Sequence, residues 1–242
     1  MFYSFFLILL IILSISYYFQ KKNLSNFLID IIEGFSKNFK YEYKNSKIIG
    51  LENIKEEFIK EKLIKYLNYS IFLLPLYEIS EEIGENNWVK NVKLTTDYKD
   101  TLFIEIKEYR PIGIYSFNNN NFYFNSFGKI IDHIDPTSKI NENLLIFQGL
   151  ASTQEANKLL EILINLNIDK ELKIQKIIYV EKRRWDILIN NNVKLLLSEI
   201  NPKKSLENFL KIKENLSETE FNNIIKFDLR NLNKTLLTNY ND

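Results

Sequence analysis

Cysteine is absent from this 242-residue sequence, and histidine occurs once, at His133. The lack of cysteine excludes disulfides, thiolate zinc sites, iron–sulfur clusters and cysteine nucleophiles. A single histidine excludes metal sites built from several histidines, and a Ser-His-Asp triad would depend on His133 alone. Only six glycines are present, so glycine-rich loops that hold phosphate groups are not available either.

An excess of charge of either sign is also missing. The chain carries 32 lysine and arginine residues against 31 aspartate and glutamate residues, which gives a net charge of +1. This balance lacks the basic footprint of a nucleic-acid-binding protein, and we expect no nucleic-acid partner. Hydrophobic residues make up 45% of the chain and aromatic residues 14%, which is enough to form a buried core in one large domain or two small ones.

The N-terminal segment is a long apolar run. Residues Phe2–Phe19 carry no charge. As a helix with a rise of about 1.5 Å per residue, they would span roughly 27 Å, close to the thickness of a hydrocarbon core. Tyr17 and Tyr18 lie where an interfacial aromatic belt belongs, and Lys21 and Lys22 follow them. The sequence therefore predicts a single transmembrane helix surrounded by lipid.

The flanks of this segment bear on its cleavage and its orientation. A cleaved signal peptide needs a basic region before the apolar run and a small-residue cleavage site after it. Only Met1 precedes the run, and no alanine or glycine follows it before Gly34, so we expect an uncleaved anchor. Four lysines follow the run, and by the positive-inside rule they would place the main domain in the cytoplasm: Lys21, Lys22, Lys37 and Lys40. Charge alone therefore leaves the orientation open.

A small β-α-α-β-β module is predicted after the apolar segment. Its strands and helices are expected at 47–51, 55–68, 77–85, 88–96 and 101–108. In the last strand Leu102, Ile104 and Ile106 alternate with Phe103, Glu105 and Lys107, which is typical of a strand with one buried face. Two helices on one face of such a sheet leave the other face and an edge open, as in a binding module.

Beyond Pro111 the pattern is mostly one of strands. Short strands are predicted at 112–115, 122–125, 129–132, 144–147, 174–180, 185–189, 193–197 and 224–232. Ser152 and Glu155 have the spacing of a capping box that opens an amphipathic helix, and Pro202 precedes a second helix. The predicted fold class is α+β, with one N-terminal transmembrane helix, the small β-α-α-β-β domain, and a mainly antiparallel β domain with two helices.

Five segments in order resemble the FtsQ/DivIB family of bacterial cell division proteins. KIIGL (47–51) is similar to the opening strand of the family's POTRA domain, and NNWVKNVKLTTDYKDTLFIEIKEYRPIGIY (86–115) to its strand pair and Glu-x-Arg-Pro junction. FYFNSFGKII (122–131), KRRWDILINNNVKLLL (182–197) and IIKFDLRN (224–231) resemble a hairpin, the Arg-Arg-Trp strand pair and the closing Asp-Leu-Arg strand. The sequence departs from the family at Asn231, where an aromatic residue is common, and in lacking a basic tail before the apolar run.

The resemblance implies a domain organisation and a function. The expected parts are a transmembrane anchor at 1–20, a juxtamembrane stem at 21–45, a POTRA-like domain at 46–110, an FtsQ-type β domain at 111–232 and a C-terminal tail at 233–242. The implied function is that of a bitopic inner-membrane scaffold, with the bulk of the chain in the periplasm and concentrated at the division septum. It would link early and late division proteins and help control septal peptidoglycan synthesis. The alternative is a POTRA-bearing envelope chaperone or assembly factor for outer-membrane or secreted proteins.

The resemblance also implies partners. The last strand and the segment beside it would receive FtsB, which binds together with FtsL, and the POTRA-like domain would bind other divisome proteins. An edge strand can do this because its free N–H and C=O groups pair with a strand of another chain. The candidate partner-binding residues are Phe227, Asp228, Leu229, Arg230, Asn231, Leu232 and Arg184.

The residues alone leave the roles of these side chains open. Asp228 and Arg230 could simply flank a buried Leu229, with both charges satisfied by neighbours. Alternatively they flank a docked partner, and the sequence does not settle which face of the strand points inward. Arg184, with Arg183 beside it, could clamp a partner carboxylate through two hydrogen bonds or form a structural ion pair.

No catalytic residue, metal site, cofactor or small-molecule substrate is predicted. His133 is close to Asp132 and Asp135, but one histidine and two local carboxylates form a poor ligand set. An envelope enzyme that uses two facing carboxylates, such as a peptidoglycan hydrolase, is the remaining enzymatic alternative.

Overall fold

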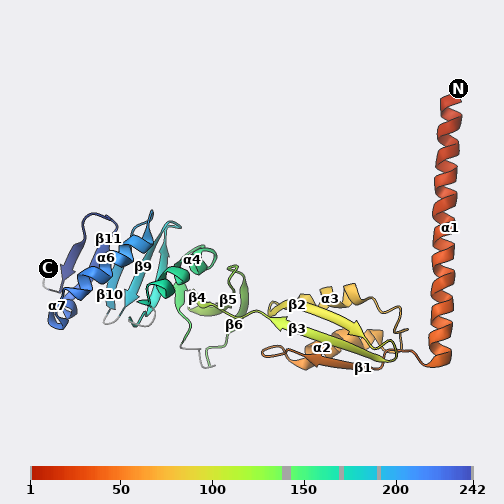
Figure 1. Ribbon diagram of the computed structural model, residues 1–242, viewed down its shortest axis with the longest axis horizontal. Helices are drawn as coiled ribbons and strands as arrows, with labels where there is room; N and C mark the ends of the chain where they lie inside the picture. The colour runs from red at the N-terminus through yellow and green to blue at the C-terminus, as the bar shows by residue number, and fades with distance from the viewer. Residues whose placement is uncertain (1, 138–142, 169–171, 190–191, 241–242) are drawn as a thin grey trace. The chain divides into compact units, whose positions relative to one another are not determined.

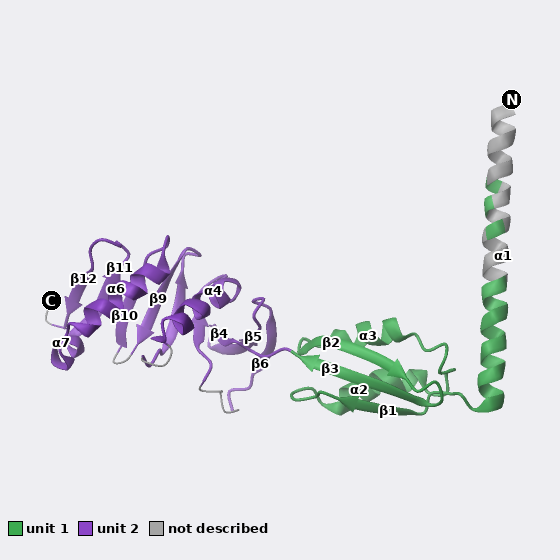
Figure 2. Ribbon diagram, in the orientation of Figure 1, with its two compact units in different colours: residues 1–108 green, residues 109–242 purple. Residues whose placement is uncertain are grey.

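The computed structural model describes residues 2–137, 143–168, 172–189 and 192–240, and within the first helix it describes the side chains at 11, 14, 17 and from 24 onward. The chain divides into two compact units, residues 1–108 and residues 109–242 (Figures 1 and 2). Each unit encloses its own cluster of buried apolar side chains. The fold is mixed α+β, as the sequence predicts.

The first unit contains a three-stranded sheet and the helices that cover it. Its elements are α1 (Phe2–Phe39), β1 (Asn45–Ile49), α2 (Glu56–Leu63), the 3-10 helix η1 (Ile64–Tyr66), α3 (Leu76–Gly84), β2 (Val89–Thr96) and β3 (Thr101–Glu108). The strand order is β1-β3-β2, with β1 parallel and β2 antiparallel to the central β3. After α1, this is the β-α-α-β-β order that the sequence predicts.

The alternation predicted in β3 is confirmed. Leu102, Ile104 and Ile106 are at most 2% exposed, and they belong to one core with Ile59 of α2 and Ile79 of α3. Successive side chains of a strand point to opposite faces. The apolar set of β3 therefore selects the sheet face on which α2 and α3 pack.

The first helix, α1, runs without interruption through the predicted anchor and most of the predicted stem. In the described part of the chain, no helix has both the length and the apolar character needed to cross a membrane. The anchor predicted at 2–19 lies mainly outside the residues whose side chains are described. At its C-terminal end α1 is attached to its unit by a 2.6 Å hydrogen bond between the buried hydroxyls of Ser36 and Ser70.

The second unit contains a nine-stranded sheet. Its elements are β4 (Gly113–Phe117), β5 (Asn120–Phe124), β6 (Ile130–Ile134), β7 (Ile146–Gln148), α4 (Ser152–Asn165), β8 (Lys176–Val180), β9 (Arg184–Ile189), β10 (Val193–Leu197), α6 (Pro202–Glu214), α7 (Glu218–Asn222), β11 (Ile224–Leu229) and β12 (Leu236–Asn239). The strand order is β12-β11-β10-β9-β8-β7-β4-β5-β6. Three neighbouring pairs are parallel, namely β10–β11, β4–β7 and β7–β8, and the other pairs are antiparallel.

One face of this sheet is covered by α4 and α6 (Figure 1). Ile187, Leu195 and Phe227 lie side by side on β9, β10 and β11 and are fully buried. They belong to the same core as Leu159 of α4 and Phe209 of α6. The side chains at the alternate positions of these strands therefore point to the opposite face, away from the helices.

The prediction of helix starts in this unit was partly wrong. Ser152 does not form a capping box with Glu155, because α4 begins after Ala151, which adopts a left-handed conformation and makes no side-chain cap. A capping box forms instead at Ser217 and Glu220, where it opens α7. This five-residue helix was not predicted, because it is too short to produce the apolar repeat by which longer helices are predicted.

Candidate functional site: an exposed strand edge beside an ion-pair cluster

One edge of the nine-stranded sheet is formed by β12, and not by β11 as the sequence predicted. The prediction that the last strand runs from 224 to 232 and ends the folded part is wrong, because β11 ends at Leu229 and the chain returns to form β12. β11 is consequently paired on both sides, parallel to β10 and antiparallel to β12. The segment predicted as a tail at 233–242 contains the last strand of the sheet.

The new edge carries exposed apolar side chains. Leu236 is 53% exposed, Leu237 is 41% exposed, and Tyr240, which follows the strand, is 67% exposed. Leu237 pairs with Phe227 and Leu236 pairs with Asp228, so the register with β11 is fixed at both positions. A strand at the end of a sheet, with apolar side chains still open to solvent, is suited to accept a further strand.

The predicted candidate residues on β11 occupy both faces of the sheet. Phe227 and Leu229 are at most 1% exposed and lie in the core, so their side chains support the edge from within and do not offer a contact surface. Asp228 lies on the opposite face, between Leu196 of β10 and Leu236 of β12. The question that the sequence left open, which face points inward, is thus settled for Phe227 and Leu229.

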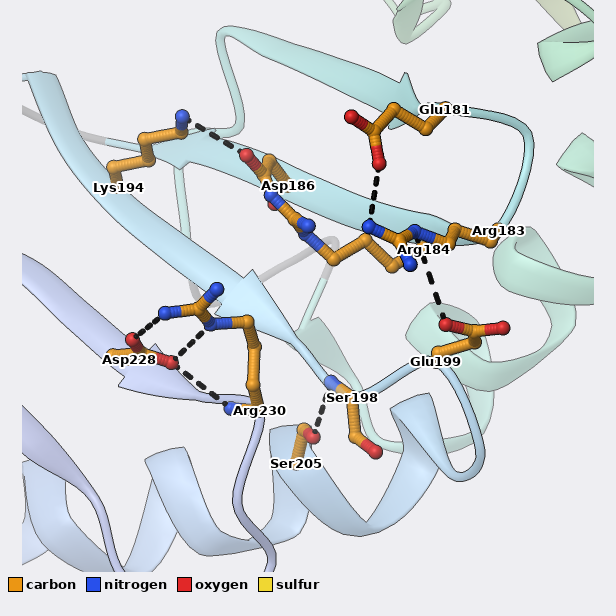
Figure 3. Close-up of polar contacts among 10 residues, drawn as sticks. All are labelled: Glu181, Arg183, Arg184, Asp186, Lys194, Ser198, Glu199, Ser205, Asp228 and Arg230. Carbon is orange, nitrogen blue, oxygen red and sulfur yellow. Dashed lines mark hydrogen bonds and ion pairs between the residues drawn. The ribbon is translucent and has the colours of Figure 1, made fainter.

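Asp228 and Arg230 form a local fork of hydrogen bonds (Figure 3). The Arg230 Nε donates to Asp228 Oδ1 at 2.8 Å, and Nη2 donates to Oδ2 at 2.5 Å. The guanidinium beside Asp228 holds the pKa of this carboxyl below its usual value, and the Asp228 carboxylate in turn raises the pKa of Arg230. The Arg230 side chain is still 52% exposed, so it can contact another molecule while Asp228 orients it.

Arg184 belongs to a second ion-pair group on the same sheet face. The Asp186 side chain is only 2% exposed, and its carboxylate lies 2.9 Å from the Lys194 Nζ and 3.4 Å from the Arg184 Nε (Figure 3). Asp186 and Asp228 both pair with Leu196, one from each side, so the two ion-pair groups are neighbours across β10. Of the two alternatives for Arg184, the structural ion pair is present.

Arg183 points to a different set of carboxylates. Its Nη2 donates to Glu181 Oε2 at 2.5 Å, and its Nε lies 4.0 Å from Glu199 Oε2 (Figure 3). Both carboxylates belong to loops at the end of the sheet. Arg183 and Arg184, although adjacent, therefore serve two separate groups of charges.

The turn between β11 and β12 is held by hydrogen bonds from α6, and sequence reasoning, which predicted the helix, missed these contacts. The fully buried Ser205 Oγ accepts a hydrogen bond from the Ser198 N–H at 2.9 Å (Figure 3). It also donates a hydrogen bond to the Leu229 carbonyl at 2.9 Å. Asn208 Nδ2 donates to the Leu232 carbonyl at 2.9 Å. In the sequence, Ser205 and Asn208 are visible only as two polar residues beside the inward-facing apolar residues of a helix. Their hydrogen-bond partners are determined by tertiary packing, which no local pattern reveals.

The remaining predicted candidates lie in turns or surface positions. Asn231 Oδ1 accepts the N–H of Asn233 at 2.9 Å, so this residue closes the turn after β11. His133 lies on β6, with Nε2 3.4 Å from Asn120 Oδ1. Among the described residues, no group of three histidine, aspartate or glutamate side chains is arranged to hold a metal ion.

The fold and the edge define a class of protein with a POTRA domain followed by a large β-sheet domain. Residues 44–109 match the sequence model of the FtsQ-type POTRA domain, and residues 114–230 match that of the C-terminal region of cell division protein FtsQ/DivIB. The chain is 31% identical over 224 residues to cell division protein FtsQ of Rickettsia prowazekii, a match that covers 88% of this chain and 78% of the relative. The chain belongs to the FtsQ/DivIB family of cell division proteins.

Two further relatives carry the same name. Cell division protein FtsQ of Rickettsia typhi is 29% identical over 218 residues, covering 88% of this chain and 79% of the relative. That of Zymomonas mobilis is 23% identical over 194 residues, covering 78% of this chain and 59% of the relative. The family resemblance predicted from the sequence is thus confirmed, and with it a role in cell division.

Proposed function

We propose that this protein is a non-enzymatic, single-pass scaffold of the bacterial division machinery, and that its β12 edge accepts a strand of FtsB, which binds together with FtsL. The observation that carries this proposal is the position of β12 at the end of the nine-stranded sheet with Leu236, Leu237 and Tyr240 exposed. Backbone pairing at such an edge supplies affinity, and alternate side chains supply selectivity.

The ion pairs beside the edge support this proposal. The partly exposed Arg230 directly follows β11, the strand next to β12, and is held in a fixed orientation by Asp228. A preorganised guanidinium recognises a carboxylate with two parallel hydrogen bonds and loses little side-chain freedom on binding. We propose that the partner strand carries a carboxylate that contacts Arg230, with Arg184 of the neighbouring group close by.

The rest of the chain would place this edge at the division site. In this proposal residues 1–20 anchor the chain in the inner membrane, residues 21–45 form the stem, and the domains at 46–110 and 111–232 lie in the periplasm at the septum. The POTRA-like domain recruits earlier division proteins, and the β domain binds later ones that control septal peptidoglycan synthesis. Two membrane-anchored partners share a small volume, so a modest interface is sufficient.

A proline scan of β12 tests the docking mode. In an antiparallel pair, N–H groups point alternately toward and away from the neighbouring strand. Prolines placed singly at Leu236, Leu237, Thr238 and Asn239 should therefore fall into two classes. At two alternate positions, proline should leave β12 paired to β11, which hydrogen exchange would show. The same two variants should no longer co-purify with the periplasmic parts of FtsB and FtsL.

The other two positions act as matched controls, because there the proline removes a donor to β11 and weakens the strand itself. Full co-purification by all four variants would show that the partner does not pair with β12. If the unaltered chain does not co-purify with FtsB and FtsL either, these two proteins are not its partners.

A further inference from the structure

The last four turns of α1 carry an apolar stripe that neither core uses. Its six side chains are each between 47% and 62% exposed: Leu24, Phe27, Leu28, Ile31, Phe35 and Phe39. Residues three and four apart lie on the same side of a helix, so these positions form one continuous surface. The opposite side of the same turns carries the exposed polar residues Asn26, Asp30, Glu33 and Lys37.

The spacing of this stripe fits a second helix better than a lipid surface. Leu24, Leu28, Ile31 and Phe35 follow one another at intervals of four, three and four residues, the repeat by which helices pack in a left-handed supercoil. Helices that lie in a lipid surface usually carry a basic polar face. The polar face of α1 instead holds two carboxylates, Asp30 and Glu33, which makes docking on anionic lipid unfavourable.

The glycine at the border of the stripe, Gly34, is not required by any packing contact of the described residues. A Cβ atom added to Gly34 would meet no atom within 4 Å. Glycine inside a helix is destabilising relative to alanine, so the packing of this unit alone does not account for it. Beside an interface, however, the missing side chain allows the backbone of a second helix to approach closely.

The apolar surface extends from α1 onto the loops of its own unit. The Phe35 ring centroid lies 6.5 Å from that of Phe72, and Phe72 lies 6.4 Å from Tyr98. Phe72 is 43% exposed and Tyr98 is 68% exposed. A contiguous exposed apolar surface of this kind marks an interaction site.

We infer that the stripe is an interface between two copies of this chain, with their α1 helices parallel. A second copy would present the same uncharged stripe, so each layer of the pair is apolar and no like charges oppose one another. The charged residues Asp30, Glu33 and Lys37 remain on the outer side of both helices. Four turns are too short for a stable isolated pair, so the interface rests on the proposed membrane anchor, which keeps the helices parallel and concentrated.

Single cysteines can map this interface, because the natural chain contains no cysteine. Leu28→Cys and Ile31→Cys report on the stripe, and Asn26→Cys and Glu33→Cys are matched controls on the opposite side of the same turns. The full chain is reconstituted in vesicles without any other protein and is then oxidised to form disulfides. We expect disulfide-linked dimers several-fold more abundant for the two stripe variants than for the two controls.

A second pair of variants separates self-association from other occupants of the stripe. Adding Ile31→Asp to Leu28→Cys should abolish the dimer, whereas adding Asp30→Asn should leave it unchanged. Equal dimer yields on both sides of the helix would overturn the inference. So would a stripe cysteine that is shielded from a water-soluble maleimide without forming dimers, since lipid would then be the occupant. The vesicles contain neither FtsB nor FtsL, so the result is independent of docking at β12.

Discussion

At the scale of single residues, Glu108 links the end of β3 to the start of α2. Its Oε1 accepts the N–H groups of Glu52 at 2.9 Å and Ile54 at 3.0 Å, and its Oε2 accepts the N–H of Asn53 at 2.9 Å. Burial by itself would raise the pKa of Glu108, but these N–H donors outweigh it and lower the pKa. The Glu-x-Arg-Pro segment thus begins with a carboxylate that stabilises the loop before α2.

This contact predicts a pH dependence. Because the folded pKa of Glu108 is lowered, its contribution to stability is present above the unfolded pKa of about 4.3 and is lost as the pH falls through the folded pKa. At neutral pH, Glu108→Gln should cost about 1 kcal/mol once solvent screening is considered, and should speed amide exchange at residues 52–54 by about fivefold. The substitution should also make the protection of these amides less dependent on pH in the acid range, once the exchange rates are corrected for intrinsic exchange.

The control for this measurement is Glu105→Gln, at a partly exposed position of the same strand, where the carboxylate lies 3.8 Å from the Lys93 Nζ. It should leave exchange at residues 52–54 unchanged. If the two variants behave alike, the hydrogen bonds of Glu108 do not hold the loop.

At the scale of elements, regular apolar patterns could be predicted and context-dependent elements could not. Leu102, Ile104 and Ile106 define their own strand and its buried face, because alternation is a local property. β12 has no such signal, since Leu236 and Leu237 are adjacent and both exposed. It forms because the turn after β11 returns the chain along that strand, and this depends on contacts with α6.

The same reasoning applies to the candidate site. Asp228 and Arg230 could be singled out because IIKFDLRN resembles the family's closing strand, and charges two residues apart on a strand share a face. The burial of Asp186 between Arg184 and Lys194 depends on the register of β9 against β10, which no local pattern reveals. The predicted edge was therefore displaced by one strand, although the charges beside it were identified.

The hydrogen bonds that join α6 to the sheet lead to an element-scale prediction. Ser205→Ala leaves the N–H of Ser198 and the carbonyl of Leu229 without their partner, which should cost about 2 kcal/mol. The loss should appear as a lower urea midpoint for unfolding of the second unit, followed by the fluorescence of Trp185 in a chain in which Trp88 is replaced by Phe.

Ser152→Ala is a matched control for this prediction. Ser152 is also fully buried, but within the described part of the chain its Oγ has no hydrogen-bond partner. Its removal should be close to neutral or slightly stabilising, because no partner is left unpaired. An equal loss of stability for both serine variants would show that the Ser205 hydrogen bonds contribute nothing specific.

At the scale of the whole molecule, the two units carry two different proposed binding functions. Each unit has its own core, and the two clusters share no residue among those described. In our account α1 and the POTRA domain position the protein and pair it with a second copy, while the edge of the large sheet receives a partner strand. Both proposed roles use exposed surfaces of the chain.

The central claim is that β12 accepts a strand of FtsB. Hydrogen exchange of the full chain, with and without the periplasmic parts of FtsB and FtsL, tests it most directly, because exchange reports on the N–H groups that the proposal uses. We predict slower exchange at residues 236–240 on binding, with the other edge strand, β6, unaffected. Protection at β6 or elsewhere, with residues 236–240 unchanged in the bound complex, would contradict the claim.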